Sequence, residues 1–96
     1  MNILSNKDFF NDVSEYYDNM VNFEQSLKNK TTNLKKFLSP GIKNAADIGC
    51  GSGIDSIALA TLGVEVCGFD SSMMMIEKAE INAENANKVI NFYNFT

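Results

Sequence analysis

The sequence predicts an α/β fold in which a small parallel sheet follows a helical N-terminal region. Two observations lead to this prediction. Apolar residues recur at helical spacing until Ser39-Pro40-Gly41, and from Ile42 onwards the pattern changes to strand, glycine turn, helix and strand. This alternation is typical of a βαβ unit, whose two strands run parallel. We therefore expect a helical segment followed by the start of an open sheet.

Two helices are predicted in the N-terminal region. Residues 5–8 have the Ser-x-x-Asp form of a capping box, and the apolar spacing behind them predicts a first helix over about Asp8 to Asn22. The same spacing continues from Phe23 to Leu38, which predicts a second helix that stops before Pro40. Residues 1–40 are thus expected to form a helical appendage.

The remaining residues, 41–96, predict alternating strands and helices. We expect a strand over Ala45–Ile48, a helix over Ile54–Leu62, a strand over Val64–Phe69, a helix capped by Ser71 or Ser72, and a strand over Val89–Phe95. This order predicts the N-terminal half of a Rossmann-like open sheet, truncated to about three parallel strands. In such sheets the first strand is central, so its free edge here predicts either a longer parent protein or self-association.

Composition and charge limit the classes of partner. The net charge is −4, every basic residue is Lys, and no run of like charges occurs, which argues against a nucleic-acid partner. No stretch approaches the roughly 20 apolar residues that cross a bilayer, and the N-terminus lacks the apolar segment of a signal peptide. We therefore expect a cytoplasmic protein without a membrane partner.

The two cysteines do not suggest a metal site. Cys50 and Cys67 lack CxxC spacing, and the chain contains no His, so one copy cannot assemble a four-ligand zinc site. Cys67 alternates with apolar residues and is expected in the core. Cys50 lies between two glycines, and we do not expect it to be a nucleophile.

The glycine turn is the main candidate for a binding site. Its glycines are Gly49, Gly51 and Gly53, and an acid, Asp70, ends the following strand. A dinucleotide fingerprint requires glycine at the first, third and sixth places, and the sixth place here is Ile54, which disfavours an NAD(P) site. Two alternatives stay open: the glycines serve only a tight turn, and Asp70 only caps the next helix.

Two segments together resemble the class I S-adenosylmethionine-dependent methyltransferases. The run Asp47-Ile48-Gly49-Cys50-Gly51-Ser52-Gly53 is similar to that family's first motif, and the run from Phe69 to Ala79 is similar to its second. The resemblance implies S-adenosylmethionine as cofactor and a small-molecule methyl acceptor. The sequence departs from the family's pattern after the last strand, where Asn94-Phe95-Thr96 supplies no clear adenine contact.

The resemblance also implies a set of cofactor-binding residues. The glycines would lie against the methionine part of the cofactor, with Asp47 near its ammonium group, and Asp70 would accept hydrogen bonds from the ribose hydroxyls. Ser71 and Met75 would flank the adenine, and Tyr16 and Tyr17 would lie on a helix that closes over the cofactor, although packing is the commoner role of such aromatic residues. The implied set is Asp47, Gly49, Cys50, Gly51, Gly53, Asp70, Ser71, Met75 and Tyr17.

Two functions from different classes follow. The first is a methyltransferase of which this chain supplies the cofactor half, with no catalytic base assignable from the sequence. The second is a truncated, non-catalytic module that self-associates through the free edge of its first strand.

Overall fold

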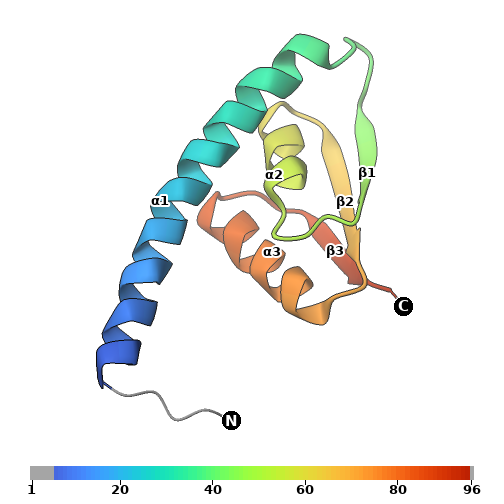
Figure 1. Cartoon of the computed structure of the whole chain (residues 1–96). Helices are drawn as coiled ribbons and strands as arrows, with labels where there is room; N and C mark the ends of the chain where they lie inside the picture. Colours follow the sequence, from blue (N-terminus) through green and yellow to red (C-terminus); the bar gives the residue numbers. More distant parts are fainter. Residues whose placement is uncertain (1–5, 96) are drawn as a thin grey trace.

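A computed structural model describes the backbone of residues 6–95 and the side chains from residue 22 to residue 95. Residues 6–95 form three helices and three strands in alternating order (Figure 1). The elements are α1 Asn6–Phe37, β1 Asn44–Ile48, α2 Ile54–Thr61, β2 Glu65–Asp70, α3 Met73–Asn85 and β3 Asn91–Asn94. The predicted α/β order is confirmed.

The three strands form one parallel sheet with the order β1-β2-β3. Ile48 of β1 lies opposite Phe69 of β2, which in turn lies opposite Tyr93 of β3. The carboxyl ends of all three strands therefore meet at one edge of the sheet, where open α/β folds bind their ligands. The predicted Rossmann-like sheet of three parallel strands is confirmed.

The N-terminal region forms one continuous helix, α1, where the sequence analysis expects two. No Gly or Pro separates the two predicted helices, and the first such residues after them are Pro40 and Gly41. The β-branched Thr31 and Thr32 lie within α1, and their hydroxyls donate to the carbonyls of Leu27 and Lys28 at 2.7 and 3.0 Å. The continuous apolar period therefore belongs to one helix of 32 residues.

The core lies between the sheet and two helices on one of its faces. These helices are α2 and α3, and the buried side chains of β2 contribute to the same core. Helix α1 packs on the outside of α2 (Figure 1). The buried apolar residues are Cys50, Ile57, Ala58, Val64, Val66, Ile76, Ala79 and Ala83. Helices α2 and α3 supply most of them, and this packing anchors the loops that precede both helices.

The opposite face of the sheet carries apolar side chains that no described helix covers. Phe69 stacks on Tyr93 with ring centroids 5.3 Å apart, and Phe95 meets Phe69 edge-on at 6.5 Å. Ile48, beside them on β1, is 69% exposed. Strand β1 pairs only with β2 among the described residues, so its outer edge is free. Within the same residues, no helix is long and apolar enough to cross a membrane.

Candidate functional site

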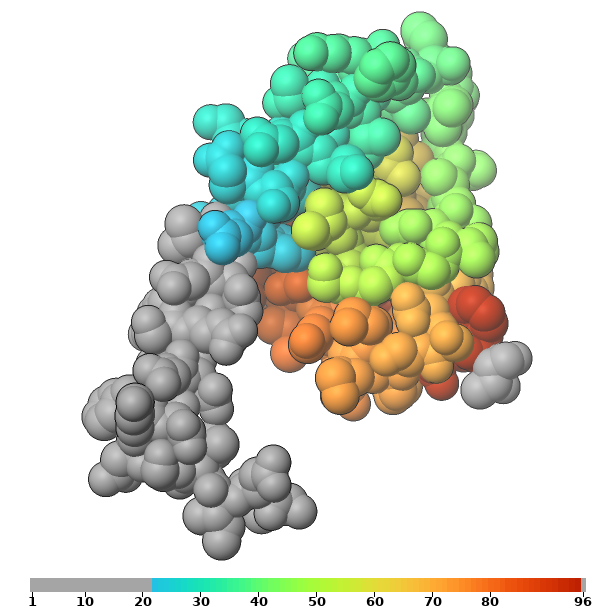
Figure 2. All heavy atoms as spheres, in the orientation of Figure 1, coloured from blue at the N-terminus to red at the C-terminus, as the bar shows by residue number. Residues whose placement is uncertain are grey.

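The glycine loop between β1 and α2 is fixed to the end of β2. The backbone N–H groups of Gly49 and Cys50 both donate to the carbonyl of Phe69, at 2.7 and 2.8 Å. The loop lies at the surface beside the start of α3 and the end of β3 (Figure 2). This places it at the carboxyl edge of the sheet.

The glycines of the loop have two different functions. Gly49 and Gly51 have φ angles of +74° and +55°, and a Cβ added to either would meet no atom within 4 Å. Gly53 begins α2 with φ of +90°, and its added Cβ would lie 3.2 Å from Cβ of Ala79. Gly53 therefore allows α3 to approach the loop, whereas backbone at Gly49 and Gly51 is open to a ligand.

Asp70 connects the glycine loop to the start of α3. Its Oδ2 accepts from the N–H of Gly51 at 2.9 Å, and its Oδ1 accepts from the N–H of Ser72 at 2.8 Å. These bonds to Ser72 and Gly51 lower the pKa of the Asp70 carboxyl below its ordinary value, because they favour the charged form. A carboxylate has about four acceptor positions, so about two remain for a ligand.

Asp47 lies on the other side of the loop and faces α2. Its Oδ2 accepts a hydrogen bond from Oγ of Ser56 at 2.7 Å, and Ser56 is fully buried. The charges of both Asp47 and Asp70 contribute to raising the pKa of the Cys50 thiol. Two carboxylates are therefore near the loop.

Cys50 is a buried residue of the loop with a weakly acidic thiol. Burial raises the pKa of the Cys50 thiol above its ordinary value, and the charges of Asp47 and Asp70 raise it further. Because the thiolate is the reactive form, these surroundings oppose a role as nucleophile.

We predict that Cys50 reacts slowly with iodoacetamide in the folded protein at pH 8. The rate should be at least about tenfold lower than in urea, where burial and the neighbouring charges no longer act on the thiol. Peptide mapping by mass spectrometry at timed intervals measures it. Equal rates with and without urea would contradict this description of the loop.

The residues predicted to flank an adenine lie next to Asp70. Ser71 is exposed between β2 and α3, and Met75 is half-buried in the first turn of α3. Of the two serines predicted as caps, Ser72 caps α3, and its Oγ accepts from the N–H of Met75 at 3.3 Å. Tyr16 and Tyr17 lie on α1, and their side chains fall outside the described ones.

Three polar contacts of the site were missed by the sequence analysis. Besides the Ser56 hydroxyl, Nδ2 of Asn82 on α3 donates to the Ser52 carbonyl at 3.0 Å, and Nδ2 of Asn94 donates to the Asp70 carbonyl at 3.1 Å. Asn82 lies next to buried Ala83 on α3. A polar residue beside the buried face of a helix is the one sequence signal that could have indicated its contact.

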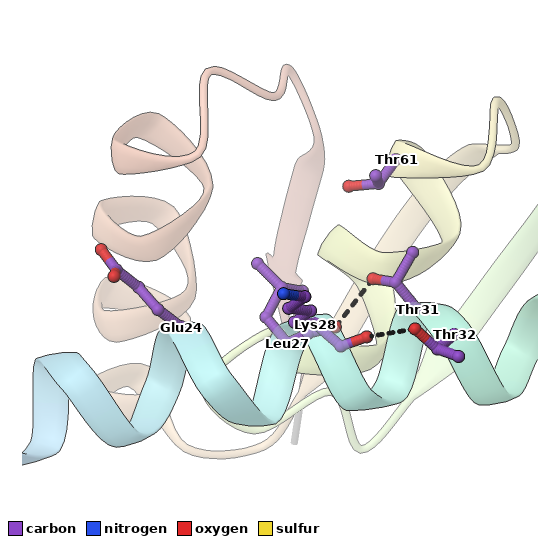
Figure 3. A pocket seen from close by; sticks show the side chains of 6 residues that line it. All are labelled: Glu24, Leu27, Lys28, Thr31, Thr32 and Thr61. Carbon is purple, nitrogen blue, oxygen red and sulfur yellow. Dashed lines mark hydrogen bonds between the residues drawn. The ribbon is translucent and has the colours of Figure 1, made fainter.

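A hollow of about 330 Å³ lies between α1 and the C-terminal end of α2, away from the glycine loop (Figure 3). The lining residues are Glu24, Leu27, Lys28, Thr31, Thr32 and Thr61. All three threonine hydroxyls donate to carbonyls of their own helices, which removes them as donors to a ligand. The glycine loop lies at the other end of α2, whose eight residues span about 12 Å. We therefore place the candidate site at the loop.

Comparison with known proteins identifies the family of residues 45–95. A family model described as a methyltransferase domain matches residues 45–95. The ubiquinone biosynthesis O-methyltransferase of Cereibacter sphaeroides is 42% identical over 50 residues, which are 52% of this chain and 20% of that protein. The chain thus spans about a fifth of the length of the curated relatives it matches.

Solved structures of methyltransferases share the fold. Magnesium protoporphyrin IX methyltransferase of Synechocystis PCC 6803 with bound SAM (S-adenosylmethionine) is 29% identical with a TM-score of 0.57, over 78% of this chain and 38% of that one. The tRNA (uracil-54, C5)-methyltransferase of Pyrococcus abyssi in complex with S-adenosyl-L-homocysteine is 33% identical with a TM-score of 0.61, over 73% and 17%. Since the family model matches more than half of its residues, the chain belongs to the methyltransferase-domain family.

Proposed function

We propose that this chain is the cofactor-binding part of a SAM-dependent methyltransferase. The observation that carries the proposal is the contact between Asp70 and Gly51, in which a carboxylate lies 2.9 Å from the backbone of an open glycine loop. Gly51 and Asp70 are 19 residues apart in the sequence and belong to the two motifs described above. Their contact brings the ends of two neighbouring strands together in one site.

The open loop and the two acids fit the parts of this cofactor. We propose that Gly49 and Gly51 contact the methionine part, that Asp47 attracts its ammonium group, and that Asp70 accepts from the ribose hydroxyls. Gly53 and the small buried Cys50 shape the loop. Ser71 and Met75 are proposed beside the adenine, and Tyr17 on α1 is proposed as a cover.

Charge at the site favours a cationic ligand over a dinucleotide. Asp47 and Asp70 lie near the loop, and residues 44–77 contain no Lys or Arg. SAM has a sulfonium, an ammonium and a carboxylate group and therefore a net positive charge, whereas the diphosphate of NAD(P)H is negative. Like charges repel, so the acidic surroundings support the methyl donor.

The cofactor supplies an activated methyl group when bound. The residues of this chain would hold it in place and align it, which is the main requirement of an in-line displacement. We propose a small-molecule acceptor, because the net charge of −4 disfavours the phosphate backbone of a nucleic acid such as tRNA. We also propose that residues 1–40 are an appendage to a half-domain formed by residues 41–96.

Isothermal titration calorimetry tests this function. We expect S-adenosylhomocysteine to bind the chain with a Kd at least about tenfold lower than that of NADH, because the loop has acids and lacks cations. Equal or tighter binding of NADH would overturn the proposal. Titration of the Asp55→Asn variant serves as a charge control, since Asp55 pairs with Lys30 at 3.3 Å instead of facing the loop.

A second candidate function is self-association through the free edge of β1. The observation that favours it is an unpaired strand edge next to Ile48, which is 69% exposed. Light scattering after size exclusion should give a mass above the 10.6 kDa of one chain, and Ile48→Lys should restore 10.6 kDa. The control is Ile42→Lys, outside β1, which should not change the mass. A wild-type monomer at high concentration would exclude this candidate.

A further inference from the structure

The hydroxyl of Ser56 is directed across the core at Asp47. Ser56 is fully buried in α2, and its Oγ donates to Oδ2 of Asp47 on β1 at 2.7 Å. A buried hydroxyl without a partner is costly, so this bond fixes the rotamers of both side chains. It crosses from a helix to a strand, between residues nine positions apart.

The local surroundings explain why Ser56 does not bond to its own helix. Thr31, Thr32 and Thr61 each donate to the carbonyl four residues earlier. Ser56 lies in the first turn of α2, so the carbonyl four residues earlier is that of Ser52, which precedes the helix and accepts from Nδ2 of Asn82 at 3.0 Å. The hydroxyl of Ser56 donates to the carboxylate instead.

The bond leaves one oxygen of Asp47 available. Oδ2 accepts from Ser56, whereas Oδ1 has no hydrogen bond among the described residues. Asp47 is half-buried, directly before the loop in which Gly49 and Gly51 are open. A carboxylate held through one oxygen can present the other to a cationic group in a fixed direction.

We infer that Ser56 is a positioning residue, which holds Asp47 so that its free oxygen receives the ammonium group of the cofactor. The inference rests on the proposed function and adds a residue that does not itself touch the cofactor. It also makes a prediction about ligands. Loss of the Ser56 hydroxyl should weaken only those ligands that have the ammonium group.

Two adenosine ligands separate this function from general support of the loop. S-adenosylhomocysteine has the amino-acid part, and 5′-methylthioadenosine lacks it. By calorimetry, we expect Ser56→Ala to raise the Kd for S-adenosylhomocysteine about tenfold, the effect of misplacing one charge-assisted bond, and to change that for 5′-methylthioadenosine less than about twofold. Ser56→Cys, a weak donor of similar size, should give the same selectivity if the alanine variant is unstable.

Two further variants complete the test. Thr61→Ala removes a hydroxyl from the same helix and should change neither Kd. In an Asp47→Ala background, Ser56→Ala should cause no further loss, because its effect passes through the carboxylate. Equal weakening of both ligands by Ser56→Ala, or additive losses in the double variant, would overturn the inference alone. Failure of the wild-type chain to bind S-adenosylhomocysteine would overturn the proposed function and the inference with it.

Discussion

Replacement of Asp70 by alanine is expected to lower the affinity for S-adenosylhomocysteine by about 100-fold or more. The variant loses the acceptor proposed for two ribose hydroxyls, and hydrogen bonds to a charged group are roughly twice as strong as neutral ones. It also loses the bonds to Gly51 and Ser72, which hold the loop against α3. Calorimetry measures the change, and circular dichroism at the same temperature shows that the variant is folded.

Matched variants separate the ligand contact from the charge. Asp70→Asn keeps the size of the side chain but turns one acceptor into a donor, so we expect an intermediate loss of about tenfold. Asp55→Asn removes the same charge from an exposed ion pair with Lys30 and should change the affinity less than about twofold. A folded Asp70→Ala protein with wild-type affinity would contradict the assigned function of Asp70.

Replacement of Gly68 by alanine is expected to destabilise the protein by about 2–3 kcal/mol. An added Cβ would lie 2.5 Å from Cδ1 of Phe92 and 3.2 Å from Sγ of Cys50. The Phe92 ring lies close to the β2 backbone at this point, so a methyl group would force the half-buried ring to move. The free energy of unfolding in urea, followed by circular dichroism, measures the loss.

Two comparisons establish that crowding is the cause. Gly41→Ala adds a methyl group where no atom lies within 4 Å, and its stability should stay within about 0.5 kcal/mol of the wild type. Shortening the ring in the Gly68→Ala, Phe92→Leu double variant should recover part of the loss, so that the two changes are less than additive. If Gly41→Ala and Gly68→Ala were equally stable, the packing described here would be incorrect.

The order of the sheet elements could be predicted because each element carries a local signal. Helical stripes end at Gly63 and begin again after Ser72, and strands lie between them. That Asp70 lies at the same edge of the sheet as the glycine loop followed from the fold class, since parallel strands end at one edge, whereas its bond to Gly51 was not predicted. The number of N-terminal helices was not predicted correctly. The prediction ended one helix at Asn22 and began another after it, although no Gly or Pro interrupts the apolar period there.

The supports of the site could not be predicted in the same way. Ser56 and Asn82 are common polar residues, and their partners are 9 and 30 positions away. Whether such a hydroxyl bonds within its helix or across the core depends on its position in the helix and on the groups that face it, which only the fold determines. Gly68 gave no signal either, because its function is to make room for Phe92, a residue on another strand.

The most direct test of the account is a titration of the isotopically labelled chain with S-adenosylhomocysteine, followed by the shifts of its backbone amide signals. The account predicts that the largest shifts fall on residues 47–53 and 70–75, at the ends of β1 and β2. Gly51 and Ser72 should be among them, because their N–H groups donate to the carboxylate that is proposed to bind the ribose. Saturable shifts confined to other residues, such as those around the hollow between α1 and α2, would contradict it.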